Sequence, residues 1–135
     1  MTRTLFTLCL FCAAVIAQKL TKIPASQTSA GSGQEMYRSY CASCHGLDGK
    51  GNGPAMSALK MPPTDLTQLA RRNRGQYPEM QVFNTIAGDG NVPSHGSKDM
   101  PVWGPLFSRL SGSDAPKAKL RIRNLTKFIE SIQAR

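Results

Sequence analysis

The sequence Cys41-Ala42-Ser43-Cys44-His45 decides how the rest of this 135-residue chain is interpreted. The two cysteines are three positions apart, so on one helical turn both sulfur atoms lie on the same face. An imidazole follows the second cysteine directly. Cys-x-x-Cys-His is the pattern in which two thiols attach to the vinyl groups of one porphyrin and the histidine offers its iron a nitrogen. We therefore predict one covalently attached haem c at Cys41 and Cys44, with His45 as an axial ligand.

Three other uses of a close cysteine pair are weighed against this interpretation. A thioredoxin-like redox pair follows a strand in a βαβ unit, and no strand pattern precedes Cys41. A structural zinc ion needs four ligands, and the adjacent residues Cys44 and His45 cannot easily both reach one tetrahedral centre. A plain disulfide is the simplest alternative, but export of the chain and the helical context of the pair favour haem.

The first 17 residues have the pattern of a cleavable signal peptide. Arg3 provides a short positive start, and residues 5–17 form a mostly apolar run that ends in small residues. A run of this length is too short for a membrane span, which needs about 20 residues, so an uncleaved membrane anchor is the less favoured interpretation. Cys9 and Cys12 lie inside the run and would be removed with it. We expect the mature protein in the periplasm or otherwise exported.

The net charge narrows the classes of partner. The formal charge is +9, and a basic surface attracts acidic proteins, nucleic acids or anionic lipids. The sequence has no nucleic-acid-binding motif and no basic stretch in which aromatic residues alternate with Lys and Arg. Export also argues against nucleic acid as the partner. We expect a monomer whose redox protein partners dock through acidic surfaces.

The pattern of apolar residues after the signal peptide predicts a flexible leader at residues 18–32, followed by an all-α domain over residues 33–135. Apolar residues recur at helical spacing, and no useful strand alternation appears. Helices are predicted near 33–45, 55–60, 66–72, 79–87, 105–110 and from 116 to the C-terminus. In the last helix, Lys and Arg, including Arg121, occupy the positions between the apolar ones. Because apolar side chains are few for so many loops, we expect the haem to supply the centre of the core.

A glycine-rich segment, residues 46–54, follows His45 directly. Its four glycines exclude a helix, and a phosphate loop is disfavoured because no Gly-Lys-Ser/Thr follows. We expect this backbone to pass close to a flat face of the cofactor. Pro54 is predicted to give its carbonyl to the outer ring nitrogen of His45 and so to fix the ring.

The second axial ligand decides the chemistry, because a thioether there raises the reduction potential and favours electron transfer over ligand binding. Met100 is the preferred ligand, since it lies on a loop well separated from the motif and is flanked by Pro101 and Trp103. Met61 and His95 stay open as alternatives, and bis-histidine ligation would lower the potential.

Other residues receive less specific interpretations. Met36 precedes the motif on the proximal side, and Met80 is predicted to fill the core from an apolar helix stripe. Trp103 is expected to pack against the haem. A haem propionate could pair with Arg71, Arg72, Arg74 or Tyr77, although solvated cations and a tyrosine that covers the fold are the simpler interpretation.

With these residues identified, the chain resembles the small soluble mono-haem cytochrome c family from Gly33 to its C-terminus. Residues 41–46 match the haem site of that family, and Met100-Pro101 matches its distal-ligand motif. Residues 51–54 and 62–66 are similar to segments of bacterial members.

The resemblance implies a cytochrome c-like fold, in which several short helices and long loops surround one haem. Gly33 and Tyr37 would cross the last helix at Leu125 and Phe128. It implies an electron carrier rather than an enzyme, whose iron keeps both axial ligands and whose exposed haem edge makes weak, small contacts with partners. Two alternatives stay open: a haem subunit or domain of a larger dehydrogenase or oxidase complex, and a haem peroxidase or gas-binding protein with a displaceable distal ligand.

Overall fold

A computed structural model describes residues 27–88, 100 and 102–134. The elements, in chain order, are α1 (Gly33–Met36), the π-helical turn η1 (Tyr37–Cys41), α2 (Ala42–His45), the 3-10 turns η2 (Met56–Ala58) and η3 (Leu66–Gln68), α3 (Leu69–Arg72), α4 (Glu79–Ala87), α5 (Gly104–Leu110) and α6 (Ala115–Ser131). No strand occurs in these residues, so the predicted all-α class is confirmed. The predicted signal peptide, most of the leader and His95 lie outside them.

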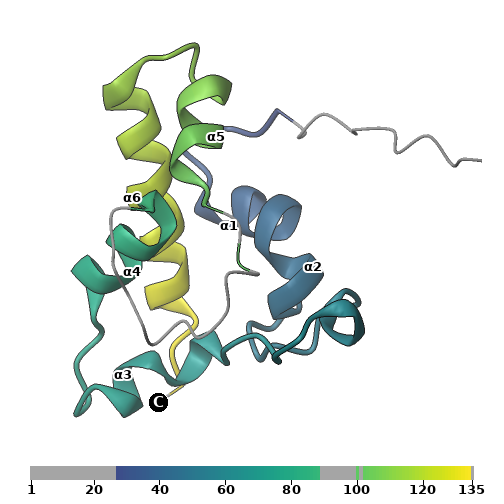
Figure 1. Cartoon of the computed structure of the whole chain (residues 1–135). Helices are drawn as coiled ribbons and strands as arrows, with labels where there is room; N and C mark the ends of the chain where they lie inside the picture. Colours follow the sequence, from purple (N-terminus) through teal and green to yellow (C-terminus); the bar gives the residue numbers. More distant parts are fainter. Residues whose placement is uncertain (1–26, 89–99, 101, 135) are drawn as a thin grey trace, which may run out of the picture.

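The helices surround the middle of the molecule. Figure 1 shows α1 and α2 on one side, α4 and α6 on the other, and α3 below them. The long helix α6 contacts α1, α4 and α5, so it is the element that joins the two sides. Within the described residues, no helix is both long enough and apolar enough to cross a membrane.

The crossing of α1 and α6 depends on the absence of a side chain at Gly33. A Cβ atom there would overlap the backbone carbonyl of Asn124 and the Cβ of Phe128. Next to this contact, the rings of Tyr37 and Phe128 lie 5.1 Å apart, and Leu125 is fully buried. The family resemblance implied this crossing at the same residues, and the structure confirms it.

Side chains and backbone of the segment before α1 also pack against the helices. The hydroxyl of Thr28 is 2.9 Å from that of Tyr40, and the amide of Asn124 donates to the carbonyl of Ala30 at 2.8 Å. Thr28 is 8% exposed. The packed part of the chain therefore already includes Thr28, which belongs to residues 18–32, the stretch predicted to be a flexible leader.

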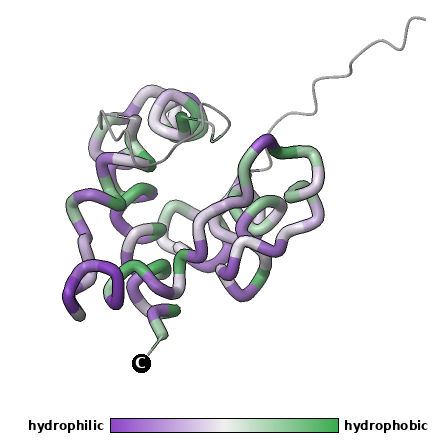
Figure 2. The backbone as a smooth tube through the Cα atoms, turned by 60° about the horizontal axis from the view of Figure 1, so that its bottom comes forward, coloured by the Kyte–Doolittle hydropathy of each residue, from purple (hydrophilic) through white to green (hydrophobic). Residues whose placement is uncertain are grey.

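Helix α4 shows which of its apolar residues form the core. Val82 and Ile86 are one turn apart and buried, whereas Met80 is 68% exposed. The prediction that Met80 fills the core is thus wrong, because the helical period turns position 80 away from α6. Gly88 ends α4 in the left-handed conformation, at φ 85°. Figure 2 shows that the end of α3 and the turn after it are hydrophilic; Arg71 and Arg72 end the helix, and Arg74 follows in the turn.

Candidate haem site

A cavity of about 440 Å³ lies between α2 and the helices α4 and α6. Its walls also include η1, residues 59–66, α3, Met100 and Trp103, and most of its lining is apolar. The volume falls within the range of roughly 300–1,000 Å³ that small-molecule and cofactor sites occupy. The cavity therefore has the size and the apolar character that a planar cofactor needs.

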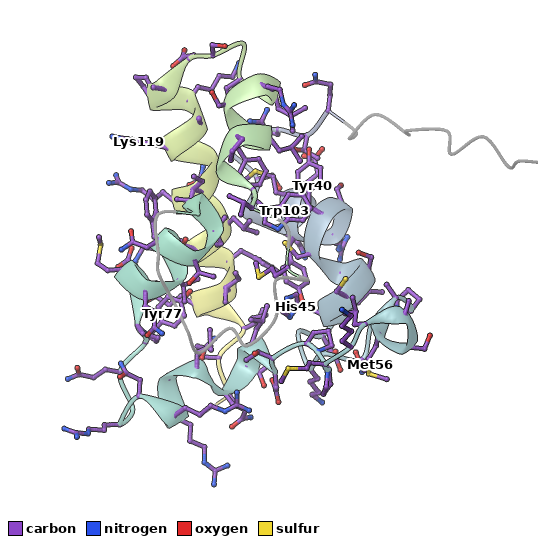
Figure 3. The ribbon with its side chains drawn as sticks, in the orientation of Figure 1. Tyr40, His45, Met56, Tyr77, Trp103 and Lys119 are labelled. Atoms are coloured by element: carbon purple, nitrogen blue, oxygen red, sulfur yellow. The ribbon has the colours of Figure 1, made fainter. Side chains whose placement is uncertain are left out.

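The three residues of the Cys-x-x-Cys-His motif all line this cavity. Cys41 closes the π-helical turn, a local widening of a helix that often occurs at functional sites. Cys44 and His45 follow on α2, which Gly46 ends with φ 78°. In Figure 3, His45 lies on the side of α2 that faces α4 and α6.

The two thiols are not bonded to each other. Burial, together with the neighbouring Cys44, raises the pKa of the Cys41 thiol to about 12. A redox-active pair needs a thiolate near neutral pH, so the buried thiol fits poorly with thioredoxin-like chemistry. Nor do the described residues bring three His, Cys, Asp or Glu side chains together as a metal site.

The ring of His45 is held by a carbonyl from a later part of the chain. Nδ1 lies 3.0 Å from the carbonyl oxygen of Thr64. Since a carbonyl oxygen only accepts, Nδ1 is the donor of this bond, which orients the ring with Nε2 as the nitrogen that would bind iron. The prediction that Pro54 provides this carbonyl is wrong. A bond from the Leu66 amide to the Gly49 carbonyl, at 2.7 Å, brings the segment around Thr64 beside the motif instead.

The glycine-rich segment packs against the chain rather than lining the cavity. A Cβ atom on Gly53 would overlap the carbonyls of Ala42 and Ser43, and one on Gly51 would overlap that of Pro63. None of residues 46–54 lines the cavity, so the expected approach to a cofactor face is not what these glycines provide. They let the backbone turn tightly beneath α2, where Gly53 donates to the Cys44 carbonyl at 3.0 Å.

The structure separates the methionines that line the cavity from those that do not. Met61 and Met100 line the cavity. Met36 is fully buried elsewhere in the core, and Met56 is 42% exposed and outside the cavity lining. The alternative ligand His95 lies outside the described residues.

Aromatic side chains form one end of the cavity. Trp103 and Tyr40 both line it, with ring centroids 5.6 Å apart, and Figure 3 shows the two side by side. Phe107 does not line the cavity, but its ring stacks on that of Trp103 with the centroids 6.1 Å apart. Trp103 thus lines the site of the cofactor, as its predicted role in packing against the haem requires.

The three arginines and the tyrosine that could bind a haem propionate differ in their position relative to the cavity. Arg72 lines the cavity, whereas Arg71 and Arg74 do not. The hydroxyl of Tyr77 donates to the Thr126 carbonyl at 2.9 Å, so this residue covers α6, which was the simpler of its two interpretations.

Gln133 is a structural residue of the site that sequence reasoning missed. Its side-chain oxygen accepts from the Ala70 amide at 2.9 Å, and its Nε2 donates to the carbonyls of Leu66 at 2.7 Å and Ile129 at 2.8 Å. Because Leu66 and Ile129 both line the cavity, Gln133 joins two of its walls. No local sequence pattern marks such a residue, since Leu66 and Ala70 lie more than 60 residues away in the chain.

The all-α fold and the Cys-x-x-Cys-His motif in an apolar cavity define a c-type cytochrome. The family model described as cytochrome C oxidase, cbb3-type, subunit III, matches residues 28–119, and the chain belongs to this family. No curated protein and no solved structure matches the chain. The protein is a c-type haem protein of electron transfer, and it passes electrons to redox partners.

Proposed function

We propose that the protein is an exported one-electron carrier with a single haem c, attached through Cys41 and Cys44 and ligated by His45 and Met100. The observation that carries the proposal is that the Cys-x-x-Cys-His motif and Met100, which is 55 residues after His45, line one cavity. Its volume and apolar walls suit a porphyrin, so the residues present fit the group.

Each residue has a distinct task. The two cysteine sulfurs hold the porphyrin, and the Thr64 carbonyl keeps the His45 ring oriented toward the iron. The bound haem supplies an iron that gains and loses one electron. The apolar walls would exclude water, and His45 and Met100, if both stay bound to the iron, would leave little to rearrange when its charge changes.

Met100 is preferred to Met61 as the distal ligand because of exposure. Both side chains line the cavity, but Met61 is 51% exposed, whereas Met100 is only partly exposed. A thioether that closes the iron site against water needs to be covered. Met61 is better suited to the rim of the cavity, where its side chain stays open to solvent.

This rim gives partners a surface on which to dock. An exposed apolar side chain at the edge of the cavity, on a chain with a formal charge of +9, suits brief contact with an acidic redox protein. Such electron-transfer encounters use small interfaces.

The oxidised holo-protein tests the ligand set. A weak sulfur-to-iron charge-transfer band is expected in its absorption spectrum and should disappear in Met100→Ala. Met80→Ala, which removes an exposed methionine outside the cavity, is the matched control and should keep the band. A band that persists in Met100→Ala and disappears in Met61→Ala would transfer the assignment to Met61.

Carbon monoxide tests the carrier function itself. The reduced carrier should bind it slowly or incompletely, because the thioether occupies the iron site. Fast and complete binding would instead support a peroxidase or gas-binding protein.

A second candidate function is that of a haem subunit in a larger oxidase complex, favoured by the description of the matching family. Purification from native membranes under mild conditions tests it. A stable complex of fixed stoichiometry would support the subunit, and recovery of the free protein would support the carrier.

A further inference from the structure

Arg121 is a buried cation on a helix whose other cations face water. It is 3% exposed, whereas Lys117, Lys119 and Arg123 on the same helix are exposed. Figure 3 shows Lys119 directed away from the body of the molecule. The sequence pattern set Arg121 with the other cations, between the apolar positions of this helix, and only the structure shows that it is buried.

The guanidinium of Arg121 is surrounded by neutral groups. Its Nε donates to the hydroxyl of Ser111 at 3.2 Å, and its Nη1 donates to the hydroxyl of Thr28 at 3.0 Å and lies 3.8 Å from the sulfur of Met36. Within the described part of the chain, no carboxylate is within ion-pair distance of it. An arginine keeps its charge in proteins, so this is a full positive charge in the interior without a counter-ion among those residues.

Hydrogen bonds and helix geometry link this charge to the cavity wall. The Thr28 hydroxyl that accepts from Arg121 is also 2.9 Å from the hydroxyl of Tyr40, which lines the cavity. On α6, residues four apart share a face, and Leu125, four positions after Arg121, lines the cavity too. The guanidinium therefore lies behind the wall that Tyr40 and Leu125 form.

An unpaired buried charge is costly, because the interior solvates it poorly and no partner offsets the loss of water. Hydroxyl and thioether groups replace only part of that hydration. The hydrogen bonds to Ser111 and Thr28 need only donors, which a neutral amide also offers, so these contacts by themselves do not require a cation at this position. The cost calls for a role of the charge itself.

We propose that Arg121 raises the reduction potential of the haem by its field, an inference that rests on the proposed function of this cavity. In the one-electron couple, the oxidised haem takes one electron from a reduced partner and its charge falls by one unit, with no proton moved. A fixed positive charge behind the wall disfavours the more positive, oxidised form. Because the charge is buried, neither water nor salt screens it as they screen the exposed cations.

Redox titration of the purified holo-protein, followed by absorbance in the presence of mediators, tests the proposal. Arg121→Gln removes the charge but keeps a polar side chain, and its midpoint potential should fall. Arg121→Lys keeps the charge and should stay close to the wild type. Arg123→Gln is the matched control, since it removes an exposed charge two positions away and should shift the potential much less.

Ionic strength separates the buried charge from the exposed one. Between about 0.01 M and about 1 M salt, the Debye length falls from roughly 30 Å to roughly 3 Å. The potential difference between wild type and Arg121→Gln should persist over this range, whereas any effect of Arg123→Gln should vanish.

A second variant neutralises the charge without removing it. Ser111→Asp places a carboxylate against the Nε of Arg121 and should lower the potential in the same direction, even if Arg121→Gln does not fold. Equal potentials in the wild type, Arg121→Gln and Ser111→Asp would overturn the proposal, and so would equal shifts in Arg121→Gln and Arg121→Lys. A haem attached as proposed, with unchanged potentials, refutes only the role of Arg121. A chain without covalent haem refutes the proposed function and this inference with it.

Discussion

Replacement of Gly33 by alanine tests the packing on which the fold depends. Gly33 is the first residue of α1, and the Cβ atom of an alanine would overlap the carbonyl of Asn124 and the Cβ of Phe128 on α6. Both obstacles belong to the backbone or to the first side-chain atom, so no flexible side chain can move aside. The two helices would have to separate.

Two effects of opposite sign determine the magnitude. Helix propensity alone favours alanine over glycine by at most about 1 kcal/mol. Overpacking of a close contact typically costs about 1–3 kcal/mol, and contact with an immobile backbone belongs at the upper end. The free energy of unfolding should thus fall by about 2 kcal/mol, which for a domain of this size lowers the Tm by roughly 8 °C.

Thermal unfolding of the holo-protein, followed by circular dichroism, measures the change. Gly31→Ala is the matched control, because its Cβ would make only an ordinary contact with the Ser29 hydroxyl at 3.7 Å. That variant should stay within about 1 kcal/mol of the wild type. If Gly33→Ala melts at the wild-type temperature or above it, the helices are not in backbone contact at this point and the reasoning is wrong.

Two further substitutions test hydrogen bonds within the fold. Burial raises the pKa of the Tyr37 hydroxyl, which donates to the Gly46 carbonyl at 2.7 Å. Because the folded protein keeps this proton where the unfolded chain loses it, the free energy of unfolding should fall as the pH rises above about 10. Tyr37→Phe should lower the free energy of unfolding by about 1–2 kcal/mol at neutral pH and should make its decrease above about pH 10 less steep. Thermal melts across a pH series measure both effects. A decrease as steep as that of the wild type would show that the Tyr37 hydroxyl is not its source. Gln133→Glu keeps the oxygen that accepts from the Ala70 amide but loses the two hydrogen bonds that Nε2 donates. The free energy of unfolding, measured in urea, should therefore fall by about 1–3 kcal/mol. The control Arg123→Gln, at an exposed position, should change it by less than about 0.5 kcal/mol.

Features that depend on neighbouring residues were predictable from the sequence. The spacing of Cys41, Cys44 and His45 puts them on one turn, and all three line one cavity. The ends of α4 and α5 lie within a residue of their predicted positions, because proline, glycine and the apolar period act locally. The predicted contact of Gly33 and Tyr37 with α6 is also present, although there the resemblance to a known family supplied the long-range partners.

The tertiary structure decided everything that depends on which distant segments meet. It gave His45 the carbonyl of Thr64, 19 residues away, instead of that of Pro54. It turned Met80 outward and the glycine-rich segment toward the backbone of α2. It also buried Arg121 beside Thr28, 93 residues away in the chain. A sequence determines local geometry through the backbone and the period of its apolar residues, but the surroundings of a side chain follow only when the helices pack together.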